Sequence, residues 1–125
     1  MTAQLFIDGS WQAAGSASQL PVFNPSTGEQ IASVACASAA DVELAVQAAR
    51  RALPAWSLRP SRERADYLRA FAAEIEARSP QLIELQMRNN GKPRHEAELD
   101  ISDAIATFAY YAELADGLDG RQNAA

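Results

Sequence analysis

The sequence predicts a chain of mixed class, in which short β-strands are followed by four α-helices. Up to about residue 37, short apolar pieces are separated by Gly, Pro and Asn, as in strands joined by turns. After residue 38 the apolar residues recur at spacings of three and four, which indicates helices. The chain also contains 27 alanines among its 125 residues, and alanine has the highest intrinsic helix propensity.

The strand region begins with a predicted hairpin. Residues 5–7 and 11–12 flank Asp8 and Gly9, and glycine tolerates the positive φ that a two-residue turn requires. A further extended piece is expected over residues 20–23. Residues 29–35 alternate well enough for another strand.

The first two helices are bounded by recognisable start and stop residues. Ser38 and Asp41 resemble a capping box, and Pro54 is expected to stop the first helix, because proline has no N–H to donate. Trp56 then falls in the connector. Ser61 is the expected N-cap of the second helix.

Ser79 is the expected N-cap of the third helix, with Pro80 as the first helical residue, and Gly91 is expected to end that helix. Pro93 opens the fourth and most regular helix. Its apolar residues form one stripe: Ile101, Ala104, Ile105, Phe108, Ala112 and Ala115.

These elements do not make a self-evidently closed domain. A few short strands form a weak sheet, and a small chain must bury nearly all its apolar faces. The four helices either form a bundle or cover a sheet that this chain does not contain. The sequence pattern leaves both pictures open.

Charge and composition exclude several classes of function. The chain has 11 Lys and Arg against 16 Asp and Glu, a net charge of −5, which argues against a nucleic-acid partner. Its single cysteine cannot form an internal disulfide. No apolar run approaches the ~20 residues that span a bilayer, and no signal peptide is visible. We therefore expect a cytoplasmic protein without a membrane partner.

Chemistry-bearing residues are few. Glu96, Asp100 and Asp103 lie at i, i+4 and i+7 of the fourth helix, so they share one face. Such a row attracts an ammonium group or a metal cation, or it is an ordinary solvated face. Cys36 is expected to be a small buried thiol, and His95 an exposed residue at a helix start. None of the phosphate-loop, dinucleotide or hydrolase motifs is present.

The order of several short motifs resembles the opening of the NAD(P)-dependent aldehyde dehydrogenase superfamily. The matching pieces span most of the chain: residues 5–11 (LFIDGSW), 24–29 (NPSTGE), 40–50, 62–64, 91–97 and 110–112, with Trp56. Residues 96–122 look like the betaine-aldehyde and aminoaldehyde dehydrogenases of that superfamily.

The resemblance implies an α/β fold for the whole protein, of which residues 1–125 are the first portion of the cofactor-binding domain, an incomplete domain. The catalytic cysteine, the general base, the oxyanion-hole asparagine, the cofactor-binding glycines and the catalytic domain are then expected after Ala125. The implied activity is oxidation of an aldehyde to a carboxylic acid with NAD or NADP, and this chain alone is expected to be inactive.

Two kinds of binding residue also follow from the resemblance. Acids at the positions of Asp100 and Asp103 lie at the mouth of the substrate channel and favour cationic aldehydes. A monovalent cation, K⁺ or Na⁺, is held by a backbone carbonyl at the position of Phe23 and an acid at that of Asn89. Here the asparagine supplies an oxygen but no charge. A homo-oligomer is expected by analogy.

A hypothesis from another class is a free-standing helical interaction module. Its acidic face would bind a cation or a basic partner. This hypothesis requires a chain that closes its own core.

Overall fold

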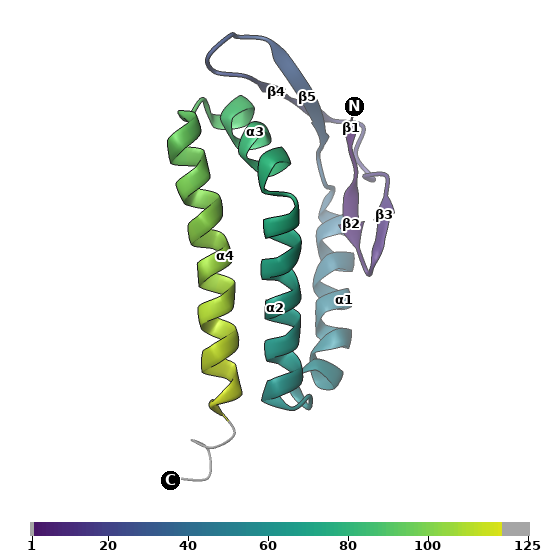
Figure 1. The fold of residues 1–125 in the computed structure, drawn as a ribbon. Helices are drawn as coiled ribbons and strands as arrows, with labels where there is room; N and C mark the ends of the chain where they lie inside the picture. Colours follow the sequence, from purple (N-terminus) through teal and green to yellow (C-terminus); the bar gives the residue numbers. More distant parts are fainter. Residues whose placement is uncertain (1, 119–125) are drawn as a thin grey trace. The chain divides into compact units, whose positions relative to one another are not determined.

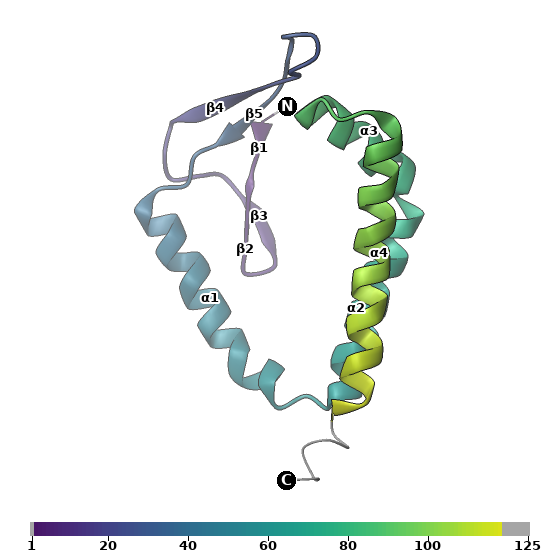
Figure 2. The ribbon, with the colours of Figure 1, turned by 90° about the vertical axis from the view of Figure 1, so that its left-hand side faces the viewer.

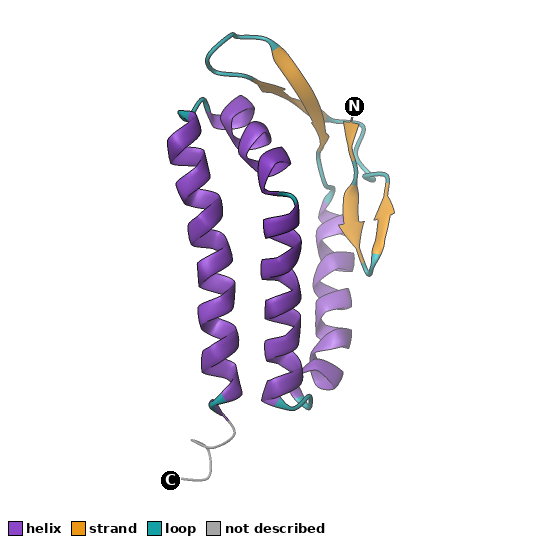
Figure 3. Cartoon of the chain, in the orientation of Figure 1, coloured by secondary structure: helices purple, strands orange, loops and turns teal. Residues whose placement is uncertain are grey.

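The computed structural model describes residues 2–118. The chain forms two compact units, Met1–Leu58 and Arg59–Ala125. Five short strands and four helices follow one another along the chain, as Figure 1 and Figure 3 show. The predicted order of strands and then helices is confirmed.

The first unit contains a three-stranded sheet and a separate hairpin. In the sheet, β5 (Gln30–Ala35) pairs in parallel with β1 (Thr2–Ala3) and antiparallel with β4 (Gln19–Phe23). The hairpin consists of β2 (Leu5–Ile7) and β3 (Ser10–Gln12). The two-residue strand β1 carries no sequence signal of its own and was not predicted.

The hairpin turns where the sequence predicts it. Asp8 and Gly9 have φ values of 54° and 78°, which is the geometry of a two-residue turn between right-twisted strands. The Asp8 carboxylate also accepts a hydrogen bond from the Arg51 guanidinium, at 3.0 Å, which ties the turn to the following helix.

Helix α1 (Ala39–Ser57) begins with the predicted capping box. The Ser38 hydroxyl accepts from the Asp41 N–H at 3.2 Å, and the Asp41 carboxylate accepts from the Ser38 N–H at 2.7 Å. The expected stop at Pro54 is wrong. Pro54 lies in the last turn, where its missing N–H costs only one helical bond, and its carbonyl still accepts from Leu58 N–H at 3.3 Å. Trp56 is therefore helical.

The second unit consists of α2 (Ser61–Ala77), α3 (Ser79–Asn90) and α4 (Arg94–Asp116). Figure 1 and Figure 2 show α2 and α4 side by side, with α3 against α4. Two alanines, Ala65 and Ala112, are fully buried and allow the long helices to approach closely. The Phe71 and Phe108 rings meet across the same pair of helices at 5.6 Å.

The predicted serine caps of α2 and α3 are wrong by one residue. Ser61 and Ser79 are the first helical residues, and the capping positions belong to Pro60 and Arg78, which make no side-chain cap. The reason for α3 is that it follows α2 almost without a break. The Ser79 hydroxyl donates backwards to the Ile75 carbonyl, at 3.1 Å, instead of accepting from its own helix.

The end of α3 is as predicted. Gly91 has φ +76°, and its N–H donates to the Met87 carbonyl at 2.9 Å. The glycine is needed because this left-handed conformation is costly for other residues. Pro93 then precedes α4.

Only small side chains are buried in the part of the chain that the structure describes. The buried apolar residues are all alanines: Ala48, Ala65, Ala72, Ala97 and Ala112. The largest fully buried side chain is that of Ser61, at 1% exposure, whereas Leu58 is 86% exposed and Phe71 is 56% exposed. The described helices therefore leave many of their large apolar side chains exposed to water.

Candidate functional site

The acidic row on α4 is the strongest cluster of chemistry-bearing residues that the sequence predicts. Asp100 lies within it with its side chain 40% exposed. Its carboxylate pairs with the Lys92 ammonium and also accepts a hydrogen bond from the Gln86 amide. Three segments thus meet at one carboxylate: α3 through Gln86, the turn after it through Lys92, and α4.

The electrostatic state of Asp100 follows from these partners. The hydrogen bond from Lys92 lowers the pKa of the Asp100 carboxyl below its ordinary value, partial burial opposes this, and the Gln86 amide and the Lys92 charge lower it further. Asp100 is therefore a carboxylate at neutral pH. Its charge is compensated by an ammonium group of the same chain.

The other two acids of the row have different surroundings. Glu96 is half exposed, and its carboxylate lies 3.3 Å from the imidazole Nε2 of His95. Asp103 is exposed, and its carboxylate makes no hydrogen bond or ion pair within residues 2–118. Of the two acids that the resemblance singles out, Asp100 is paired, and the carboxylate of Asp103 has no partner among the residues that the structure describes.

The predicted cation ligands lie in different units. Phe23 is the last residue of β4, opposite Gln30, and its side chain is exposed. Asn89 is exposed in the last turn of α3. Within the described residues, no group of three His, Cys, Asp or Glu side chains is placed to hold a metal ion. The monovalent cation remains a prediction.

His95 is exposed as expected, whereas Cys36 is less buried than the sequence predicts. The Cys36 thiol is free and half-buried, and the residue's N–H donates to the Ser18 carbonyl at 2.9 Å. His95 is 73% exposed on its side chain. No base or cation is placed to activate Cys36 as a nucleophile among the contacts of the described residues.

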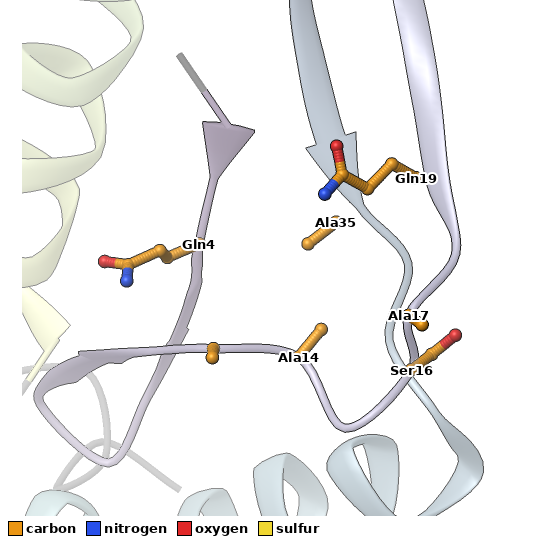
Figure 4. A pocket seen from close by; sticks show the side chains of 7 residues that line it. Gln4, Ala14, Ser16, Ala17, Gln19 and Ala35 are labelled. Atoms are coloured by element: carbon orange, nitrogen blue, oxygen red, sulfur yellow. The ribbon is translucent and has the colours of Figure 1, made fainter.

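A hollow of about 290 Å³ in the first unit is the candidate small-molecule pocket, shown in Figure 4. Gln4 and Gln19 supply its polar side chains beside Ser16, and alanines line the rest. It contains no cationic side chain and no helix N-terminus, so it does not fit the pyrophosphate of a dinucleotide. This hollow is therefore not assigned to NAD.

Sequence reasoning missed the two partners of Asp100. Lys92 precedes Asp100 by eight residues and lies before Pro93, outside the helix that carries Asp100, so no periodicity rule joins the pair. Gln86 lies on another helix. The one available signal was the lysine in the short turn immediately before an acidic helix.

Solved structures establish the class of fold. The chain matches "Structure of Lactaldehyde Dehydrogenase" with a TM-score of 0.89 and 30% identity, over 92% of this chain and 24% of that one. It matches the structure of PnpE in complex with nicotinamide adenine dinucleotide with a TM-score of 0.87 and 40% identity, over 93% and 24%. The fold is that of the aldehyde dehydrogenases, and this chain holds part of it.

The family profile described as "Aldehyde dehydrogenase family" matches residues 11–125, and the chain belongs to that family. Among curated relatives, it is 48% identical to aminoaldehyde dehydrogenase 1, peroxisomal, of Malus domestica, over 96% of this chain and 25% of the relative. It is 44% identical to betaine aldehyde dehydrogenase, chloroplastic, of Amaranthus hypochondriacus, over 97% and 25%. The chain thus spans about a quarter of the length of the relatives that it matches.

The resemblance to the family and to its betaine-aldehyde and aminoaldehyde branch is confirmed. Within residues 2–118, no helix combines the length and the apolar content needed to cross a bilayer.

Proposed function

We propose that the chain is the N-terminal part of an aldehyde dehydrogenase that oxidises an aldehyde to its carboxylic acid with NAD or NADP. The observation that carries the proposal is the family match over residues 11–125, combined with coverage of only a quarter of each relative. The uncovered apolar side chains of the described helices support it, because a part of a larger domain leaves such faces for the rest.

The covalent chemistry is assigned to residues outside this chain. Aldehyde oxidation through a thiol requires an activated nucleophile and donors for the developing oxyanion. Cys36 has neither beside it, and the candidate pocket does not fit a dinucleotide. The nicotinamide supplies the hydride acceptor when bound.

The candidate substrate is an aldehyde that carries an amino or trimethylammonium group. The names of the relatives support this class, and so does the acidic row on α4. In this proposal the face of α4 that carries Asp100 and Asp103 lies at the mouth of the substrate channel, where negative charge favours a cationic aldehyde.

The remaining parts of the proposal rest on analogy. They are a homo-oligomer, a monovalent cation near Phe23 or Asn89, and a cytoplasmic location. The relatives differ on location, since their names include peroxisomal and chloroplastic proteins.

The proposal is tested by comparing the 125-residue chain with a longer protein that carries it. We expect no NADH from the purified 125-residue chain with betaine aldehyde and NAD, and steady NADH formation from the longer protein. NADH production by the 125-residue chain itself would overturn the assignment of the chemistry to later residues. A longer protein that oxidises no aldehyde would overturn the activity.

A further inference from the structure

Lys92 is the one described cation that contacts the carboxylates predicted to attract a substrate. Its ammonium group lies on Asp100, and its side chain is only 32% exposed. The turn that presents it is held in place: the Asn90 amide oxygen accepts from the Lys92 N–H at 3.0 Å, and Gly91 adopts the left-handed conformation. Lys92 is thus fixed beside Asp100 by its backbone as well as by its charge.

An ammonium group on Asp100 competes with any cationic ligand for the same oxygens. A paired carboxylate has little negative potential at a distance, because the field of the pair is that of a dipole and falls off faster than that of a single charge. Asp103 has no such partner within the described residues. The two acids therefore contribute unequally to the potential above α4.

We infer that Lys92 is a positioning residue that holds Asp100 and cancels its charge, so that Asp103 is the carboxylate that attracts a cationic aldehyde. This inference rests on the proposed function. It adds that Lys92 limits the preference of the longer enzyme for cationic aldehydes. That preference should rise when Lys92 loses its charge.

The test compares a cationic aldehyde with a neutral one of the same shape. Betaine aldehyde has a positively charged nitrogen at its branched centre, and 3,3-dimethylbutanal has an uncharged carbon at the same place. In the longer enzyme, we expect Lys92→Met to lower the KM for betaine aldehyde roughly two- to five-fold at low ionic strength. The KM for 3,3-dimethylbutanal and both kcat values should stay unchanged. Direct binding of choline, measured by calorimetry, should tighten by the same factor.

The reverse change completes a cycle. Asp100→Asn leaves Lys92 unpaired, so the KM for betaine aldehyde should rise, whereas the double variant Lys92→Met with Asp100→Asn should return near the wild-type value. Lys92→Arg keeps the charge and should behave as the wild type. Arg94→Met is the matched control, because Arg94 pairs with Glu84 at 3.1 Å and does not contact the acidic row.

Three results would overturn the inference. In the first, Lys92→Met leaves the ratio of the two KM values and the choline affinity unchanged. In the second, Lys92→Met changes the KM values of both aldehydes by the same factor, or changes both kcat values equally, as a merely structural role would. In the third, Asp103→Asn leaves the cation preference intact. A longer enzyme that oxidises no aldehyde contradicts the proposed function instead, so the two failures are distinguishable.

Discussion

The Asp41 carboxylate is the most connected side chain of the first unit. It is buried and accepts from the Ser38 N–H at 2.7 Å, the Ser38 hydroxyl at 2.8 Å and the Gly15 N–H at 2.9 Å. It therefore caps α1 and also fixes the segment between β3 and β4. The backbone N–H groups of Ser38 and Gly15 are the main reason that the pKa of Asp41 lies below its ordinary value.

This pKa shift predicts a pH dependence of helix content. Because the folded pKa of Asp41 lies below the unfolded value of about 4, the carboxylate's stabilising effect is complete above that value. The effect is lost as the pH falls through the folded pKa. We expect the helical circular dichroism to decline on acidification, and Asp41→Asn to have lower helix content at pH 7.

The control for this prediction is an acid without these contacts. Asp103→Asn on α4 should leave the acid-induced decline as it is in the wild type. If Asp41→Asn retained the wild-type helix content at pH 7 and the wild-type decline, the charged cap would have no role.

Gly15 is held against the same carboxylate. A Cβ added there would lie 3.1 Å from the Ser38 hydroxyl oxygen and 3.3 Å from an Asp41 carboxylate oxygen, which is tighter than ordinary contact. We expect Gly15→Ala to loosen the capping box and to reduce helix content. Gly117→Ala is the control, since the nearest atom to its added Cβ is a carbonyl oxygen at 3.8 Å. Equal circular dichroism spectra for the two variants would contradict this account.

At the scale of the elements, α2 and α4 depend on small residues at their contact. Ala65 and Ala112 are 0% and 1% exposed, so no space remains for a larger side chain. We expect Ala65→Leu to destabilise the helical pair by about 1–3 kcal/mol, through the displacement that overpacking causes. The measurement is the urea midpoint of the helical circular dichroism in the longer protein that carries this chain, which should fall for Ala65→Leu.

Ala70→Leu is the matched control, because Ala70 is an exposed residue of the same helix. It should leave the midpoint nearly unchanged. A loss of equal size in both variants would mean that α2 and α4 do not pack closely through Ala65.

Most elements could be predicted from sequence because their signals are local. The Asp8–Gly9 turn, the Ser38–Asp41 box and Gly91 each act through their immediate neighbours. The errors at Pro54, Ser61 and Ser79 share a cause. A proline is tolerated in the last turn of a helix, and a helix that starts soon after another one needs no serine cap. Both cases depend on where the neighbouring helix ends or begins, which the residue itself does not reveal.

Of the candidate site, the sequence predicts only the residues that share one helix. Periodicity places Asp100 and Asp103 on one face of α4, but the Lys92 and Gln86 contacts come from the turn and from α3. Which acid is neutralised therefore depends on how the helices pack. The roles of both acids in substrate binding stay predictions.

At the scale of the whole molecule, the described residues bury alanines and expose large apolar side chains. The sequence pattern could not separate a self-contained bundle from helices that cover an absent sheet, because both require the same amphipathic stripes. The family match over a quarter of each relative, together with the exposed apolar side chains, favours the second picture.

The most direct test of this picture is the thermal unfolding of the isolated 125-residue chain, followed by calorimetry with an apolar dye present in a parallel sample. We predict dye binding at 25 °C and a broad transition whose calorimetric and van't Hoff enthalpies disagree. A monomer that binds no dye and melts in a single sharp two-state transition would contradict the claim that these helices await further polypeptide.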